Sequence, residues 1–185
     1  MKKPVFQTKG IRKIIAEFLG RHLPRYKPEI NRAIKPASVF NEAKSVFICM
    51  PFDDRQFQKA LLWTDNFKGK YPHLEMTLLV VKRHRSLAAA IKSKKVLSLT
   101  EEDGDFLKLP GKNLIRRIRR AKYDLAVDLN HDGTLFSSIL CSISGAEVRI
   151  GFTGEWSDYF LNYSFTPRSR QSISGSYEAL ANYLT

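Results

Sequence analysis

The 185-residue sequence predicts an α/β domain with a mostly parallel sheet and helices on both faces. From residue 45 onward, short apolar runs of strand length alternate with segments in which apolar residues recur at helical spacing. The segments between successive runs are mostly long enough to hold a helix, which is what neighbouring parallel strands require. The first 44 residues are basic and rich in proline, so we divide the chain into residues 1–44 and a domain over residues 45–185.

Five strands are predicted from short runs of apolar and β-branched residues. They cover residues 45–50, 76–81, 95–99, 125–129 and 148–152. The second of these runs is almost entirely apolar, as a strand buried on both faces is. Helices are predicted between and after the strands, at residues 57–67, 85–92, 112–122, 134–143 and 177–184.

Residues 1–44 are predicted to form one basic amphipathic helix followed by a proline-containing linker. The helix has an apolar stripe made of Ile11, Ile14, Ile15, Phe18 and Leu19. We expect this stripe to pack on the domain. The alternative is peripheral contact with an anionic membrane surface through residues 10–23.

The net charge of +13 is unevenly distributed. Residues 1–44 and 82–122 carry +8 and +9, whereas residues 123–185 carry −4. An anionic partner should therefore meet one side of the molecule. Cys49 and Cys141 lie in apolar runs, which indicates buried, reduced thiols. Because the sequence also has no apolar leader or membrane span, we expect a cytoplasmic location, with peripheral contact at the inner membrane as the alternative.

A polar turn follows the predicted strand at residues 125–129. Asn130, His131, Asp132 and Gly133 come directly after Leu129, and a helix restarts at once. Ligands of open parallel sheets bind where strands end and helices begin, so these four residues are candidate binding residues. The alternative is structural, because Asn130 or Asp132 could simply cap the next helix.

Two basic clusters differ in their place along the fold. Lys82 and Arg83 follow the second strand, at the binding edge of the sheet, and are candidates for contact with phosphate groups. The cluster at residues 116–120 lies within a helix and is typical of a solvated outer face, so nucleic acid is not the expected partner. The four histidines and two cysteines lack metal-ligand spacing, so no metal site is predicted.

The segment YDLAVDLNHDGTLFSSILCSISGAEVRIGF, residues 123–152, resembles glycosyltransferase family 9, the lipopolysaccharide heptosyltransferases. The features that carry the resemblance are a Tyr-Asp-Leu strand, a polar turn ending in Gly133, a Ser-Gly-Ala turn at residues 144–146 and Arg-Ile-Gly-Phe at residues 149–152. The flanking segments agree more loosely, so that the resemblance covers about residues 45–185.

This resemblance implies the N-terminal, acceptor-side domain of a GT-B glycosyltransferase, an architecture of two Rossmann-like domains with the active site between them. The implied reaction is inverting and metal-independent transfer from a nucleotide sugar, of the ADP-heptose kind, to a lipid-linked envelope glycan such as a lipid A or Kdo-bearing acceptor. No cofactor is expected to be tightly bound. The chain ends near where the first domain would finish, so we expect the main donor-binding domain to be absent from it.

The expected partners are therefore a lipid-linked glycan acceptor and a separate donor-binding domain or chain, and we expect no transfer without the latter. Under this interpretation the chain is a heptosyltransferase-like family member with an incomplete catalytic unit. The alternative function is a non-catalytic basic module that binds anionic lipid or nucleic acid.

The family places a catalytic Asp after the first strand, where this sequence has Asp53 and Asp54. The resemblance therefore implies Asp54, with Asp53 second, as the base that deprotonates an acceptor hydroxyl. An acidic pair in this position could instead cap the following helix. The family also has a His near the start of the domain's last helix, and residues 172–178 of this sequence contain none.

Overall fold

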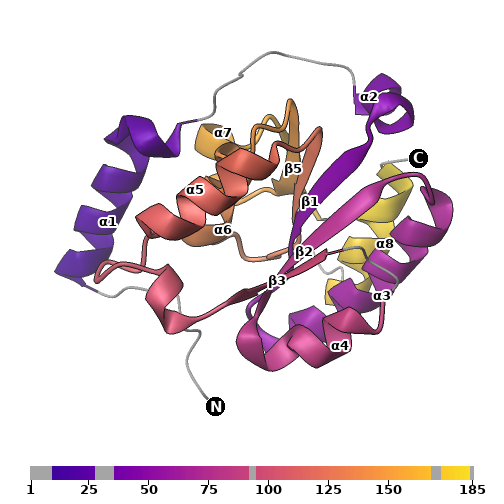
Figure 1. Cartoon of the computed structure of the whole chain (residues 1–185), viewed down its shortest axis with the longest axis horizontal. Coiled ribbons are helices and arrows are strands. Elements are labelled where there is room, and N and C mark those ends of the chain that lie inside the picture. Colours follow the sequence, from indigo (N-terminus) through magenta and orange to yellow (C-terminus); the bar gives the residue numbers. More distant parts are fainter. Residues whose placement is uncertain (1–9, 28–35, 92–94, 168–171, 184–185) are drawn as a thin grey trace.

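A computed structural model, which describes residues 10–27, 36–91, 95–167 and 172–183, shows one six-stranded sheet in which every pairing is parallel (Figure 1). The strand order is β3-β2-β1-β4-β5-β6. The strands are β1 (Ser45–Cys49), β2 (Glu75–Val81), β3 (Lys95–Leu99), β4 (Leu125–Asp128), β5 (Val148–Phe152) and β6 (Tyr163–Phe165). This order is that of a Rossmann-like sheet and confirms the predicted fold class.

The helices follow the predicted rhythm. They are α1 (Ile11–His22), α2 (Pro36–Glu42), α3 (Asp54–Lys70), α4 (Arg85–Ala89), α5 (Lys112–Ala121), α6 (Leu135–Ser142), α7 (Ser157–Phe160) and α8 (Ile173–Tyr183), with single turns η1 (Pro24–Tyr26), η2 (Lys82–His84) and η3 (Glu101–Asp103). The sequence patterns missed α2, α7 and β6, which are too short to show a period. Residues 28–35 of the predicted linker and residues 92 and 184 of two predicted helices lie outside the described residues.

Two apolar cores cover the two faces of the sheet. In β1, Phe47 and Cys49 point to the core beneath α1, α5, α6 and α7. Val46 and Ile48 point to the opposite core, which α2, α3, α4 and α8 cover. This alternation is the period of a strand, and Figure 1 shows the two groups of helices on either side of the sheet. The loops after the strands therefore emerge between two helical layers.

All six strands end at the same edge of the sheet because they are parallel. In the central pairings, Cys49 at the end of β1 lies opposite Leu79 of β2 and Asp128 of β4. The loops that follow β1, β2 and β4 consequently leave the sheet side by side. Every candidate site residue predicted from the sequence lies in or next to one of these three loops.

Helix α1 packs on α6, and of the predicted apolar stripe Leu19 takes part in this packing while Ile14, Ile15 and Phe18 do not. The side chain of Ile11 lies outside the described residues. Ala16 is buried and Leu19 is half-buried against the core, whereas Ile14, Ile15 and Phe18 are 67%, 44% and 62% exposed. The expectation that the apolar stripe packs on the domain is therefore wrong for these three residues. The reason is that α1 approaches α6 through its small residues, which allow a close contact.

The buried thiols predicted from the sequence are confirmed. Cys49 and Cys141 are fully buried and are not joined by a disulfide, and their Sγ atoms lie 3.7 Å apart. Burial raises the pKa of both thiols. Among the described residues, no helix combines the length and apolar character that crossing a bilayer requires.

Gly20 and Gly69 provide a matched test of the α1–α6 contact. A Cβ at Gly20 would lie 3.0 Å from Leu135 Cδ1, whereas a Cβ at Gly69 of α3 would meet nothing within 4 Å. We expect Gly20→Leu to lower the free energy of unfolding by about 1–3 kcal/mol through overpacking. Gly69→Ala should raise it by about 0.5–1 kcal/mol through helix propensity. Urea denaturation measures both values, and an unchanged stability of Gly20→Leu would contradict the packing of α1.

Candidate functional site

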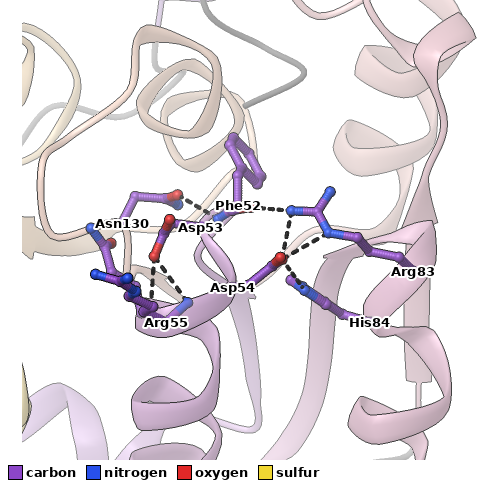
Figure 2. Close-up of polar contacts among 8 residues, drawn as sticks. Phe52, Asp53, Asp54, Arg55, Arg83, His84 and Asn130 are labelled. Atoms are coloured by element: carbon purple, nitrogen blue, oxygen red, sulfur yellow. Dashed lines mark hydrogen bonds and ion pairs between the residues drawn. The ribbon is translucent and has the colours of Figure 1, made fainter. Parts of the chain in front are cut away.

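Asp54, Arg83 and His84 meet at the carboxyl edge of the sheet (Figure 2). Asp54 begins α3 after β1, and the other two residues belong to the single turn η2 after β2. The Asp54 Oδ1 atom lies 2.8 Å from Arg83 Nε, 2.8 Å from Arg83 Nη2 and 2.8 Å from His84 Nε2. Arg83 Nη2 also donates to the carbonyl oxygen of Phe52 at 2.7 Å, which fixes the guanidinium against the loop after β1.

His84 is a buried, neutral member of this cluster. Its side chain is 7% exposed and its ring stacks on Phe57 with 3.9 Å between ring centroids. Burial lowers the pKa of His84 below its ordinary 6.5, despite the opposing effect of the hydrogen bond to Asp54. A neutral ring beside a carboxylate donates from Nε2, which leaves Nδ1 as an acceptor. That Nδ1 atom is buried, with no hydrogen-bond partner among the described residues.

Asp54 is an ionised carboxylate in which one oxygen accepts hydrogen bonds from the protein and the other is available to a ligand. The hydrogen bonds from Arg83 and then His84 lower the pKa of Asp54 below its ordinary 3.8. All of its contacts with the described residues converge on Oδ1, and the side chain is 70% exposed. Its Oδ2 atom is therefore oriented and able to accept a hydrogen bond from a ligand hydroxyl.

Asp53 has a different role from its neighbour. It is the N-cap of α3, and its Oδ1 accepts hydrogen bonds from the backbone N–H groups of Arg55 and Gln56, both at 3.0 Å (Figure 2). The two carboxylates thus diverge, one toward the start of α3 and the other toward Arg83. The capping alternative considered for the acidic pair describes Asp53 and not Asp54.

Asn130 joins the loop after β4 to the loop after β1. It is buried, its Oδ1 accepts from the Phe52 N–H at 3.1 Å, and its Nδ2 donates to Asp128 Oδ1 at 2.8 Å. Asp128 is also buried, and its Oδ2 accepts from Ser137 Oγ at 2.7 Å and Ser138 Oγ at 3.4 Å. Burial raises the pKa of Asp128, and the hydrogen bonds from Asn130 and Ser137 oppose that rise.

Gln56 of α3 holds the turn that contains His131 and Asp132. Its Oε1 accepts from the His131 N–H at 3.2 Å, and its Nε2 donates to Asp132 Oδ2 at 2.9 Å. The His131 ring packs against Phe152, with 5.0 Å between ring centroids. Its Nε2 lies 3.2 Å from Ser176 Oγ of α8. A histidine thus borders the start of the last helix, although it comes from the loop after β4.

The order Asp132, His131, Ser176 is superficially that of a hydrolase triad, but the geometry excludes it. Ser176 is fully buried, and its Oγ donates to the backbone carbonyl of Ser172 at 3.1 Å. His131 Nδ1 lies 3.5 Å from Asp132 Oδ1, too far for a firm orienting hydrogen bond. A nucleophile must reach its substrate, and this hydroxyl has no access to one.

The turn after β4 ends in a glycine for a backbone reason. Gly133 has φ +60, and its N–H donates to the Asn130 carbonyl oxygen at 3.0 Å. The cap of α6 is Thr134, whose hydroxyl oxygen accepts from the Ser137 N–H at 3.1 Å. The structural alternative, in which Asn130 or Asp132 caps this helix, is therefore wrong, because the turn places Thr134 at the helix start.

A pocket of about 540 Å³ opens beside this cluster, between the ends of β2 and β3. Its lining residues are Val81, Lys82, Arg83, Leu99, Thr100, Glu101 and Glu102. Two cations face two carboxylates and a hydroxyl there, which suits a ligand with both anionic and hydroxyl groups. No group of three or more histidine, cysteine or acidic side chains within the described ranges could hold a metal ion.

The basic cluster of α5 lies elsewhere. Arg119 donates to the carbonyl oxygen of Arg25 at 2.9 Å, and Arg117 approaches Asp103 at 3.9 Å. Arg116 and Arg120 line a separate pocket with Lys95, the first residue of β3. These two cations are therefore at the amino edge of the sheet, opposite the candidate site.

Sequence reasoning did not identify Gln56 as a site residue, and it gave His84, which lies in the candidate basic run after β2, no role of its own. His84 stands in a basic run directly after a buried strand, and that position was a usable signal. Gln56 lies in the first turn of α3 and carries no pattern of its own. Its role depends on the loop after β4, which is far away in the sequence.

The fold matches solved glycosyltransferase structures. An E. coli ADP-heptose lipopolysaccharide heptosyltransferase II matches 74% of this chain with 19% identity and a TM-score of 0.56. A glycosyl transferase family 9 protein from Veillonella parvula DSM 2008 matches 76% of it with 13% identity and a TM-score of 0.65. E. coli heptosyltransferase WaaC with ADP matches 75% with 14% identity and a TM-score of 0.60.

The matched region is 40%, 41% and 46% of those three chains, so this chain corresponds to one domain of them. No protein-family model and no curated protein sequence matches the chain. At such low identities the likeness concerns the fold. It confirms the resemblance to glycosyltransferase family 9 at that level.

Asp128 and Asp132 offer a test of the buried network. Asp128→Ala should lower the free energy of unfolding by about 3 kcal/mol or more, because Asn130, Ser137 and Ser138 lose their buried acceptor. Asp132→Ala should change it by less than about 1 kcal/mol, since that side chain is 79% exposed. Urea denaturation measures the free energy of unfolding of both variants, and equal losses in the two would contradict the buried hydrogen-bond network around Asp128.

The pKa of His84 should respond to Asp54. The pKa of His84 in the folded protein is below 6.5, so protonation opposes folding, and its contribution to stability is lost as the pH falls through that folded value. Asp54→Asn removes a hydrogen bond that raises this pKa, so it should lower the value further. NMR titration of the His84 ring measures this pKa in the wild type and in the Asp54→Asn variant. Asp132→Asn is the control and should leave His84 unchanged.

Proposed function

We propose that this domain is the acceptor-binding half of an inverting, nucleotide-sugar-dependent glycosyl transfer to lipopolysaccharide or a related envelope glycan. The observation that carries the proposal is the carboxyl edge of the sheet, where Asp54 presents an oriented carboxylate oxygen beside a pocket whose lining includes Lys82, Arg83 and two glutamates. The match to one domain of heptosyltransferase structures supports the same assignment.

In this proposal Asp54 Oδ2 accepts the hydrogen bond of the attacking acceptor hydroxyl. The low pKa of Asp54 keeps it ionised but weakens it as a base. An acceptor phosphate that binds Arg83 would draw the guanidinium away from Asp54 and raise the pKa of this carboxyl. The anionic group of the acceptor would thus strengthen the base as it binds.

The remaining predicted residues act as binding and positioning groups. Lys82 and Arg83 line the pocket and would neutralise phosphates of the acceptor. Part of the His131 side chain and most of the Asp132 side chain are exposed, and both would contact sugar hydroxyls. Asn130 and Gly133 shape the turn, and Asp53 caps α3. In this proposal these three residues position the site, and the side chains of Asn130 and Asp53 do not contact the ligand.

The nucleotide sugar, of the ADP-heptose kind, would be held by a second domain facing this edge. Transfer requires donor and acceptor to be fixed in attack geometry, so both walls of the site are needed. We accordingly expect the domain to bind an acceptor alone and to support transfer only with a donor-binding domain. The alternative, a non-catalytic basic module for anionic lipid or nucleic acid, is less favoured because the arginines of α5 are partly engaged within the protein.

The first test is acceptor binding followed by transfer. The chain is titrated with a lipid A or Kdo-bearing acceptor, and transfer is then assayed with a separately expressed donor domain of a related enzyme. Arg83→Gln should weaken acceptor binding by about tenfold or more. Asp54→Asn should reduce transfer by about 10²–10⁴-fold with a smaller effect on binding. Asp65→Asn, the same change at an exposed position of α3, should leave both unchanged.

The outcomes separate binding from chemistry. Acceptor binding that Arg83→Gln leaves intact, or no binding at all, would refute the proposed acceptor site. If Arg83→Gln weakens binding but Asp54→Asn leaves the transfer rate unchanged, the acceptor site is supported and the role of Asp54 in the reaction is refuted.

A further inference from the structure

A second pocket, of about 390 Å³, lies at the amino edge of the sheet, opposite the candidate site. Its lining residues are Lys95, Asn113, Arg116, Arg117, Arg120 and Ala121. Four of these six side chains are cations, and none of the six is acidic. We call Lys95, Arg116, Arg117 and Arg120 the amino-edge cations. The pocket at the carboxyl edge differs from this one, because two glutamates are part of its lining.

The fold brings the amino-edge cations together from two elements. Lys95 begins β3, and the alternation of a strand puts its side chain on the same face as Leu97 and Leu99, which belong to the core beneath α5. On α5, Asn113 and the three arginines follow one another at steps of three, one and three residues, so they share one face of the helix. The pocket therefore lies between this face of α5 and the start of β3.

The charge of the amino-edge cations is largely unneutralised. Lys95, Arg116 and Arg120 are exposed, and within the described ranges no hydrogen bond or ion pair links their side chains to another residue. Arg117 has one acidic neighbour, Asp103, whose Oδ1 atom lies 3.9 Å from Arg117 Nη2. Arg116 and Arg120 stand four residues apart, and like charges at this spacing destabilise a helix. A bound anion would relieve this repulsion.

The number and type of these cations indicate the chemistry of that anion. A guanidinium presents paired N–H groups in a planar fork, which matches the oxygens of a phosphate group. A phosphate monoester carries about −1.5 to −2 charges at neutral pH, so two phosphate groups are needed to balance four cations. A ligand with two or more neighbouring phosphate groups thus fits the pocket in both charge and geometry.

An acidic turn limits the length of this ligand. Turn η3 consists of Glu101, Glu102 and Asp103, and the Gly111 N–H before α5 donates to the Asp103 carbonyl oxygen at 2.9 Å. The turn therefore borders the start of α5. An extended polyanion that followed α5 toward its start would meet these acids and be repelled. The arrangement favours a compact anion over a nucleic-acid backbone.

We propose that the amino-edge cations bind a compact ligand group of the diphosphate kind, with two or more neighbouring phosphates. This inference does not depend on the proposed acceptor site, because it uses other residues at the opposite edge of the sheet. A free diphosphate and the head group of a diphosphate lipid present the same oxygens to the arginines, so the experiment has an arm for each source.

Titration with inorganic pyrophosphate tests the binding directly. Calorimetry measures the affinity of the full chain, and NMR of the ¹⁵N-labelled chain locates the site. We expect the backbone amides of residues 113–121 to shift. Arg116→Gln/Arg120→Gln should weaken binding at these residues by about tenfold or more, because it removes two charged donors. Inorganic phosphate should bind there more weakly than pyrophosphate, since it engages fewer of the cations.

A matched variant and a stability measurement control this test. Arg55→Gln/Arg85→Gln removes two exposed arginines from other helices and should leave the shifts of residues 113–121 unchanged. Any pyrophosphate bound at the carboxyl edge is detected separately, through the amides of Lys82 and Arg83. Because Arg116→Gln/Arg120→Gln removes a repelling pair, its thermal unfolding temperature should equal or exceed that of the wild type.

The lipid arm uses phosphatidylcholine vesicles that contain farnesyl diphosphate, with phosphatidylcholine alone as the blank. Flotation with the diphosphate vesicles that Arg116→Gln/Arg120→Gln abolishes would support the proposal with a lipid as the source. Binding of pyrophosphate without flotation would support it with a free ligand as the source.

Three outcomes would overturn the proposal. The first is no shift in residues 113–121 at pyrophosphate concentrations up to about 10 mM. The second is equal affinity of the wild type and Arg116→Gln/Arg120→Gln at those residues. The third is tighter binding of a single-stranded oligonucleotide than of pyrophosphate at the same salt concentration, which would assign the amino-edge cations to nucleic acid. None of these outcomes bears on acceptor binding at the carboxyl edge.

Discussion

The parallel pairing of β1 with β4 at the centre of the sheet is the constraint on which the candidate site depends. It places Cys49 opposite Asp128, so that the two following loops leave the sheet as neighbours. Asn130 then joins them by accepting from the Phe52 N–H and donating to Asp128. Because Asp128 is buried, its carboxylate needs the hydrogen bonds from Asn130, Ser137 and Ser138, and the network holds both loops in one arrangement.

This rigid base explains how two adjacent carboxylates come to differ. Asp53 is used by the start of α3, and Asp54 is turned toward the loop after β2. Arg83 contacts both Asp54 and the Phe52 carbonyl, so the third loop is joined to the same network. The result is an oriented anion beside a pocket lined by two cations, two carboxylates and a hydroxyl, which suits a ligand that carries hydroxyl and phosphate groups. Orientation of this kind is what a transfer reaction requires of its acceptor side.

Helix α1 shows how close packing selects which residues of a short helix are covered. Its small residues permit close contact with α6, and this contact leaves larger apolar residues on the outside. Lys13 in the first turn of α1 lies 3.6 Å from Glu155 in the loop after β5, so an ion pair also joins this helix to the domain.

The sequence by itself determined the strands from residue 45 to residue 152, the apolar core on both faces of the sheet, and the edge at which the candidate residues lie. These features follow from the spacing of apolar residues and from the points where strands end, and both are visible in short stretches of sequence. The tertiary structure decided the individual partners. Only the approach of separate loops showed that Asp54 pairs with His84 and that Gln56 holds the turn after β4. It likewise decided which face of α1 is covered. A period reveals an apolar face, but the shape of the neighbouring helix selects the residues that it contacts.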